Sequence, residues 1–527
     1  MSYAKAKSIS PESVFSGWVV DNTQNLFLKD QYSPYLRNAR LEWQSTIIRP
    51  GHSLFSTLTA WSYPKGIGSY LRASPASDVL IIRHNTDATH KLYTLTAGGT
   101  LTSISTGANI ASDNRMSFTN VGDVIYCFNG VDLMGKLSGT TYTTVTANVP
   151  ASFAPSFSVE FGWSHWASGW STNSNKVYKS VADNYEDFNS AGSDSFTFSE
   201  QIVGLSANLQ SLFYFTKNTI SVTGVGDITD TAGTITYTTR SLNVKEGAVN
   251  NASIVEVGDA TYFLSSSNAI NKIARGTSVN WFEVVDLSTR KYAGITEIMA
   301  TLDVDQSNSF GHYLPDANLI KWYVKKAGST INDLCIIYDI IKDAFLIDNW
   351  KPFYDEVFFK GYNYAVSFLE PKVYIDEIYQ DDEDSGIQFE YWTKEFYLSD
   401  PTYKKILWEA RTLIDINELA VLTQEIWIDW SLVDTKIIDS DNYLLATGWI
   451  GVDAVGMSPI GMSWVSITGT DDDYQEITIL RTKWNLNIKG KKIQFRFYNS
   501  SLAWKVRLKN MSMLVEILPG LANNLTT

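Results

Sequence analysis

The chain has 527 residues, of which 44% are hydrophobic and 13% aromatic, so it has ample apolar surface for large cores and is not intrinsically disordered. Its formal net charge of −14 argues against conventional binding to the phosphate backbone of nucleic acids, which depends on clustered Lys and Arg. An acidic excess keeps a protein soluble, and it would also let DNA slide past a like-charged wall.

The two cysteines, Cys127 and Cys335, lie far apart in the sequence, which favours two small buried residues over a disulfide framework or a metal site. No apolar signal sequence follows the first methionine, and no apolar run reaches the roughly 18 residues that a membrane span needs. We therefore expect a protein that is made in a cytoplasm and does not enter a membrane.

Residues 1–60 are expected to be extended, because Pro11, Pro34 and Pro50 interrupt them and no helical period is sustained. From Ser69 onward the pattern changes to short segments rich in β-branched and aromatic residues, separated by turns such as Gly98-Gly99. Many short strands without alternating helices are typical of a β-propeller or a β-sandwich. The first strands expected are residues 79–83, 91–96, 101–105, 116–119, 124–128 and 140–146.

One segment occurs twice. The sequence VGDVIYCF of Val121–Phe128 is matched by VGDATYFL of Val257–Leu264, and both are typical of a Gly-Asp turn leading into an aromatic-rich strand. Their separation of 136 residues (257 − 121) corresponds to three propeller blades of roughly 40–45 residues each. The alternative is that two unrelated hairpins share the same turn chemistry.

The acidic run Asp381–Asp384 marks a boundary, after which residues 389–396 begin a new set of strands. Residues 404–428 are the best helix candidate, but Ile406, Trp408, Ala410, Thr412 and Ile414 alternate at period two, so we predict strands. Further strands are expected at Ile477–Leu480, Lys492–Tyr498 and Met511–Ile517.

The expected fold is therefore all-β. It comprises an extended N-terminal segment over residues 1–60, a β-propeller of about six or seven blades over residues 61–388, and a C-terminal β-sandwich over residues 389–527.

Several motifs resemble chemical sites without completing them. Gly130-x4-Gly135-Lys136 resembles a phosphate-binding loop, but Leu137 replaces the Ser or Thr that binds magnesium, and a strand is expected where a helix should follow. Gly456-Met457-Ser458 falls short of a nucleophile elbow, because Ile460 replaces the final glycine.

Metal and sugar sites have weak signals. His84 and His90 flank a turn and leave a zinc site open there, while Asp381–Asp384 could bind calcium but is better explained as a solvated turn between domains. The remaining histidines, His52, His165 and His312, are scattered. Trp163, Trp166 and Trp170 could stack on sugar rings, although such a group more often packs inside a β protein. We expect no catalytic, cofactor-binding or metal-binding residues and no enzymatic activity.

Four groups of motifs follow one another along the chain. Tyr32–Arg40 leads to an Arg49-Pro50-Gly51 turn, and Ser112–Phe118 leads to Val124-Ile125-Tyr126 and Asn129-Gly130. The third and fourth groups are Trp170-Ser171 with Val177–Ser180, Asp187-Phe188, Gly204-Leu205 and Leu212–Thr216, and then Trp392-Thr393-Lys394 with Lys404-Lys405 and Gly490–Phe495. This order resembles the β-propeller tail hub, nozzle or DNA-stabilisation proteins of short-tailed bacteriophages.

The resemblance implies a structural protein of the virion tail, assembled in the host cytoplasm. Copies of the chain would form a closed ring, commonly a hexamer, that extends the DNA channel and helps to retain and eject the genome. Its partners would be further copies of itself, neighbouring tail, adaptor or fibre proteins, and genome DNA that passes through the lumen without specific binding. No membrane partner and no cofactor are implied.

Charge gives the ring hypothesis a testable form. The propeller loops are expected to supply an acidic bore, and the basic residues near the C-terminus are expected to face partner proteins. These are Lys489, Lys491, Lys492, Lys505, Arg507 and Lys509. The alternative function is a host-receptor or glycan-binding virion protein that uses Trp163–Trp170, and a glycan-cleaving tail enzyme is a third, weaker hypothesis.

Overall fold

The computed structural model describes residues 35–439 with short gaps, together with residues 7–9 and 477–517, again with gaps. In these residues α-helix is confined to α1 (Leu287–Arg290) and α2 (Ala293–Ala300), and nearly all other regular structure is strand. The predicted all-β fold class is confirmed. None of the helices in the described part of the chain is long and apolar enough to cross a membrane.

Seven four-stranded antiparallel units form most of this structure. Blades 1 to 3 are β6 (Ile67–Tyr70), β7 (Val79–Thr86), β8 (Thr89–Leu95) and β9 (Leu101–Ile104); β10 (Ser117–Val121), β11 (Val124–Phe128), β12 (Gly135–Ser138) and β13 (Thr141–Thr144); and β14 (Phe157–Phe161), β15 (Ser164–Ser168), β16 (Lys176–Lys179) and β17 (Asp194–Thr197). Blades 4 and 5 are β18 (Gly204–Asn208), β19 (Ser211–Phe215), β20 (Ile220–Gly224) and β23 (Arg240–Ser241), with a hairpin of β21 (Ile228–Thr231) and β22 (Thr234–Tyr237) inserted; and β24 (Ile254–Val257), β25 (Ala260–Leu264), β26 (Ile270–Arg275) and β27 (Phe282–Asp286). Blades 6 and 7 are β28 (Phe310–Leu314), β29 (Leu319–Val324), β30 (Leu334–Asp339) and β31 (Ala344–Asn349); and β32 (Phe353–Phe359), β33 (Tyr362–Ser367), β34 (Lys372–Tyr379) and β5 (Gly51–Thr57).

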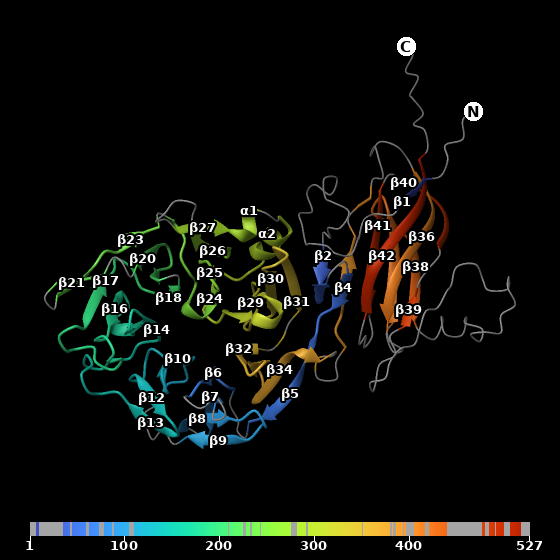
Figure 1. Cartoon of the computed structure of the whole chain (residues 1–527). Helices are drawn as coiled ribbons and strands as arrows, with labels where there is room; N and C mark the ends of the chain where they lie inside the picture. The colour runs from blue at the N-terminus through green and yellow to red at the C-terminus, as the bar shows by residue number, and fades with distance from the viewer. Residues whose placement is uncertain are drawn as a thin grey trace, which may run out of the picture.

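The seven units close into a propeller (Figure 1). Their first strands contact one another in the order β6, β10, β14, β18, β24, β28 and β32, and β32 returns to contact β6. An apolar layer lies between each pair of neighbouring blades, as where Trp166 of blade 3 meets Tyr214 of blade 4. The layer between blades 6 and 7 continues into the core of the C-terminal sheets. Because both faces of each blade are covered, strands such as β29 are buried along their whole length.

The internal repeat is confirmed as two equivalent hairpins. Gly122 and Gly258, with φ of +57° and +55°, turn the first strand of blades 2 and 5 into the second, and the pairs closing the turns are Val121 with Val124 and Val257 with Ala260. Blades 2 and 5 are three blades apart, as the 136-residue spacing predicts. Glycine suits these turns because a positive φ costs it nothing in sterics.

The N-terminal strands are divided between the propeller and the C-terminal sheets. β5 pairs antiparallel with β34 and supplies the outermost strand of blade 7, so a strand from near residue 50 completes a blade whose other strands begin at residue 353. β2 (Tyr35–Arg37) lies between β31 of blade 6 and β35 (Glu390–Trp392), while β3 (Ala39–Glu42) and β4 (Ser45–Ile48) join the C-terminal strand β42.

Two C-terminal sheets face each other and enclose a core that includes Leu407, Ile414, Ile426, Phe497 and Leu508. One sheet continues from blade 6 through β2 and β35 to β41 (Ile493–Asn499), β37 (Val421–Ile428) and β38 (Ser431–Asp439). The other contains β3, β4, β42 (Val506–Ile517), β36 (Lys405–Ile416) and β39 (Ile477–Ile479), with β1 (Lys7–Ile9) on β42 and β40 (Trp484–Gly490) on β36. The strands predicted over residues 404–428 are confirmed as β36 and β37.

Candidate functional site: the closure cluster

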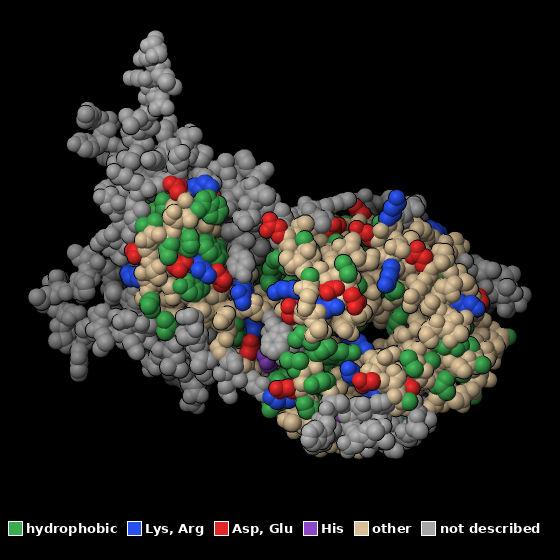
Figure 2. All heavy atoms as spheres, turned by 180° about the vertical axis from the view of Figure 1, so that it is seen from behind, with side chains coloured by type: hydrophobic (Ala, Val, Ile, Leu, Met, Phe, Trp, Pro, Cys, Tyr) green, Lys and Arg blue, Asp and Glu red, His purple; other side chains and the backbone are tan. Residues whose placement is uncertain are grey.

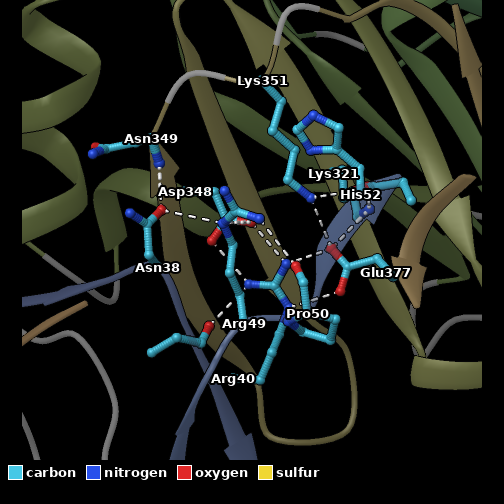
Figure 3. Close-up of polar contacts among 12 residues, drawn as sticks. Asn38, Arg40, Arg49, Pro50, His52, Lys321, Asp348, Asn349, Lys351 and Glu377 are labelled. Atoms are coloured by element: carbon cyan, nitrogen blue, oxygen red, sulfur yellow. Dashed lines mark hydrogen bonds and ion pairs between the residues drawn. The ribbon is translucent and has the colours of Figure 1, made fainter. Parts of the chain in front are cut away.

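A buried group of charged residues lies where the N-terminal strands meet blades 6 and 7 (Figure 3). We call it the closure cluster, because it surrounds the point at which β5 completes the propeller. Its members come from β3, β5, β29, β31, β32 and β34 and from the loops beside them: Arg40, Arg49, His52, Lys321, Asp348, Lys351, Glu356, Asp376, Glu377 and Asp382.

Arg40 joins blade 6 to blade 7. Its Nη1 and Nη2 donate to the two carboxylate oxygens of Asp348 at 2.9 and 2.7 Å, and Nη2 also donates to Glu377 Oε1 at 2.6 Å. The side chains of all three residues are at most 8% exposed. Burial would lower the pKa of Arg40, but attraction to Asp348 and Glu377 outweighs it, so the guanidinium stays charged.

Arg49 holds the loop after blade 7. It forms a bidentate ion pair with Asp382, in which Nη1 donates to Oδ1 at 2.9 Å. His52 Nδ1 also lies 2.9 Å from Asp382 Oδ1. Although burial opposes it, the hydrogen bond from His52 and the charge of Arg49 hold the pKa of Asp382 well below its usual range. The interpretation of Asp381–Asp384 as a solvated turn is therefore wrong for Asp382, which is paired and largely buried; the other three acids lie outside the described residues.

Two lysines lie at the centre of the cluster. Lys321 Nζ is 2.7 Å from Asp376 Oδ2 and 3.0 Å from Glu377 Oε1, and Lys351 Nζ is 2.6 Å from Asp376 Oδ1. Lys321, Lys351 and Asp376 are fully buried. Burial alone would lower the pKa of Lys321, but Asp376, Glu356 and Glu377 raise it well above its ordinary range. Lys321 is therefore held as a charged ammonium group by the carboxylates bonded to it.

Glu356 is the exception in this balance. The four cations Arg40, Arg49, Lys321 and Lys351 are already matched by the four carboxylates Asp348, Asp376, Glu377 and Asp382. Lys321 Nζ lies 3.4 Å from Glu356 but 2.7 Å from Asp376, so its charge stabilises Asp376 more strongly. Burial raises the pKa of Glu356 from 4.5 to about 7, so this carboxyl is protonated in weak acid.

This shift predicts a pH dependence. An acid whose pKa is raised on folding stabilises the folded state below its unfolded pKa, and that contribution is lost as the pH rises through about 7. We expect Glu356→Gln, which mimics the protonated acid, to melt close to the unaltered protein at pH 5 and above it at pH 8. Calorimetric melting temperatures at both pH values measure the difference, and an equal difference at both would contradict the assignment.

The chemistry of the cluster suits mechanical attachment. Its four cations pair with four of its carboxylates, and the residues that the structure describes contain no group of three or more His, Cys, Asp or Glu placed to hold a metal ion. A neighbouring cavity of about 330 Å³ is lined partly by Arg40, Asp376 and Glu377, whose charged atoms are used in the ion pairs. The cluster can therefore hold the N-terminal strands, blade 6 and blade 7 together.

A second cavity lies on the propeller axis, with a volume of about 760 Å³ and residues of all seven blades and their connections in its wall. Figure 2 shows a hollow near the middle of the propeller, with charges of both signs on the surrounding surface. The charged lining consists of Lys65, Asp113, Arg115 and Asp355, which pair as Lys65 with Asp113 and Arg115 with Asp355. The described residues that line this cavity thus carry two positive and two negative side chains, and the acidic bore of an assembled ring stays a prediction.

The three tryptophans do not share a surface. Trp166 and Trp170 are buried in different layers, between blades 3 and 4 and between blades 2 and 3, whereas Trp163 is 73% exposed. A sugar site formed by all three is therefore wrong, and only Trp163 among them is available to a ligand.

The incomplete motifs are structural where the structure describes them. Gly135 and Lys136 begin strand β12, and Lys136 Nζ lies 2.7 Å from Glu186. His84 is buried beside Tyr93, while the side chain of His90 lies outside the described residues, as does the whole of Gly456-Met457-Ser458. Burial raises the pKa of the Cys127 thiol to about 12, as expected for an inert core cysteine.

The basic C-terminal residues are described only in part. Lys492 pairs with Glu395 at 3.1 Å and lies over the ring of Trp430, so part of this charge is used within the chain. Arg507 lies in β42 and is half-buried. The expectation that this end faces partner proteins stays a prediction.

The closure cluster itself was missed at the sequence level. Its arginines lie in the Asn38-Ala39-Arg40 and Arg49-Pro50-Gly51 motifs that carry the family resemblance, but nothing near them in the sequence identifies their partners. Asn38 adds to the joint, because its side-chain oxygen accepts from the backbone N–H of Asn349 at 2.7 Å.

The sequence matches no known family model and no curated protein. Solved structures with a similar arrangement include BamB from Moraxella catarrhalis, with 12% identity, a TM-score of 0.38, and coverage of 64% of this chain and 92% of BamB. YCF48 from Cyanidioschyzon merolae has 12% identity and a TM-score of 0.38, covering 61% of this chain and 97% of its own. The computationally designed Ika8 protein has 8% identity and a TM-score of 0.35, covering 62% and 100%.

Proposed function

We propose that the chain is a non-enzymatic component of a short-tailed phage virion, a ring-forming tail hub or nozzle protein that extends the DNA channel. What supports the proposal is the joint between its two units. The nine-stranded sheet runs from blade 6 into the C-terminal sandwich through β2, and the closure cluster fixes the adjoining strands β3 and β5. A part that bears load in a tail has to transmit force between its domains without a flexible linker, and this joint has that property.

The order of parts agrees with what the family resemblance implies, namely an N-terminal segment, a propeller and a C-terminal sandwich. A propeller is a rigid disc with short, protected edges, and copies that pack side by side form a closed ring when the rotation between them allows it. The net charge of −14 suits a wall past which DNA moves without being held.

The purified chain is expected to form closed rings of six copies. Sedimentation velocity would give the mass of the assembly, and negative-stain images would show a ring with a central bore. A stable trimer would favour the receptor-binding alternative.

In the intact particle, a cryo-EM map should place the propellers around the DNA channel of the tail, with Asp and Glu in excess on the residues that face the axis. A bore lined mainly by Lys and Arg would contradict the proposal.

A further inference from the structure

Trp163 is the most exposed aromatic side chain in the described part of the chain, at 73%. It lies in the turn between β14 and β15, at the end of blade 3, beside the corresponding turn between β18 and β19 of blade 4. A single exposed apolar side chain is ordinary on a protein surface, so the argument for a site rests on what surrounds the indole of Trp163.

The backbone makes the same point. Gly162 and Trp163 have φ of +57° and +61°, a turn in which both central residues adopt the left-handed conformation. Gly and Asn suit such positions, whereas a bulky side chain is disfavoured there. The backbone N–H of Asp183 donates to the carbonyl of Trp163 at 2.8 Å and helps to hold the turn. The turn thus holds a large ring outward in a conformation that disfavours it. Trp430 shares the exposure and the left-handed backbone, so what distinguishes Trp163 is the groove beside it.

A shallow groove of about 370 Å³ adjoins the ring, lined by Glu160, Phe161, Gly162, Trp163, Ala207, Asn208 and Gln210. Glu160 accepts a hydrogen bond from the Tyr185 hydroxyl at 3.0 Å, which orients its carboxylate. An aromatic face beside a carboxylate and two amides offers a stacking surface together with donors and acceptors for hydroxyl groups. The volume is near the lower end of that of small-molecule sites and fits one or two sugar rings.

The charge of the groove restricts the class of ligand that it can bind. None of its lining residues is basic, and Glu160 is acidic, so uronic acids, sialic acids and phosphates would be repelled. A protein partner is disfavoured too, because Phe161, Trp166 and Trp170 are buried, and among the residues that line the groove Trp163 is the one large apolar side chain that is exposed. We propose that this groove binds a neutral carbohydrate by stacking a sugar ring on Trp163. The site goes beyond the proposed tail function and does not depend on ring assembly.

The test uses the full chain and two panels of oligosaccharides, one of neutral glucose, galactose and N-acetylglucosamine oligomers and one containing uronic or sialic acids. Calorimetric titration, with saturation-transfer NMR for weak binders, should detect at least one neutral oligomer and no acidic one. Trp163→Ala is expected to weaken that binding at least tenfold, and Trp163→Phe by only a few-fold. Absence of binding by every neutral oligomer at millimolar concentration would overturn the proposal, and so would binding that survives Trp163→Ala.

A matched control exists in the same chain. Trp430 is 62% exposed and also left-handed, with φ of +68°, but it is not among the groove residues. Trp430→Ala should leave binding unchanged. Trp163→Gly separates binding from structure, because glycine accepts the turn without strain: we expect it to abolish binding while the melting temperature stays the same or rises. A clear fall in melting temperature would instead assign Trp163 a structural role.

Discussion

Replacing Asp376 by Ala is expected to destabilise the propeller by about 3–5 kcal/mol, because it leaves two fully buried ammonium groups without their shared partner. Lys321 and Lys351 contact opposite oxygens of this carboxylate, at 2.7 and 2.6 Å. After the substitution, Glu377 and Glu356 would be the carboxylates left to neutralise the two ammonium groups, and Glu356 lies 3.4 Å from Lys321. Chemical unfolding followed by tryptophan fluorescence measures the loss.

The Lys136–Glu186 pair provides the control. Its Nζ–Oε2 distance is also 2.7 Å, but the two side chains are 30% and 31% exposed. Glu186→Ala is therefore expected to cost only about 0–1 kcal/mol, because water replaces the lost partner and screens the remaining charge. Equal losses in the two variants would show that burial does not govern the strength of the closure cluster.

Local sequence signals predicted the elements well. Turn chemistry and alternation at period two act within a few residues, so the Gly122 and Gly258 hairpins and the strands over 404–428 were recognisable. A bulge makes the pattern of buried side chains within β36 hard to predict from alternation alone. The register shifts between Leu407 and Glu409, so Leu407 and Ile414 are both buried although their positions differ by an odd number.

Long-range pairings could not be predicted in this way. Arg40 bonds to Asp348 and Glu377, 308 and 337 positions away, and a single sequence holds no signal for such distances. The same limit applies to β5, whose composition does not reveal that it completes blade 7. The predicted boundary at residue 60 separates segments by local pattern, whereas the fold joins them by strand pairing.

The tryptophans show how a local turn alters a site. Trp166 and Trp170 are four residues apart, and continued alternation would place them on the same face of one strand. β15 instead ends at Ser168, and Gly169, with φ of +80°, redirects the chain. Trp170 consequently packs on the blade 2 side and Trp166 on the blade 4 side. The spacing of the tryptophans in the sequence therefore suggested a shared surface, whereas the fold places Trp166 and Trp170 in two different apolar layers.

Deleting residues 1–58 is expected to abolish the folded propeller. The deletion removes β5, leaves β34 as an open edge in a three-stranded blade, and takes away β2, which links blade 6 to the sandwich. It also removes Arg40 and Arg49, both cationic partners of Asp348, whose side chain is fully buried in the intact chain. Breaking a buried ion pair by removing one partner costs about 3–5 kcal/mol, which is a large part of the stability of a typical domain.

Deletion of residues 1–34 is the matched control, because among the described elements it removes only β1, which lies at the edge of β42 far from the blades. We expect the protein without residues 1–34 to stay soluble with an unchanged propeller. The protein without residues 1–58 should be insoluble or rapidly proteolysed. A peptide of residues 35–58 added during refolding should restore solubility, because it carries β2 to β5 and both arginines. If the protein without residues 1–58 melts within a few degrees of the intact chain, neither β5 nor the closure cluster closes the propeller.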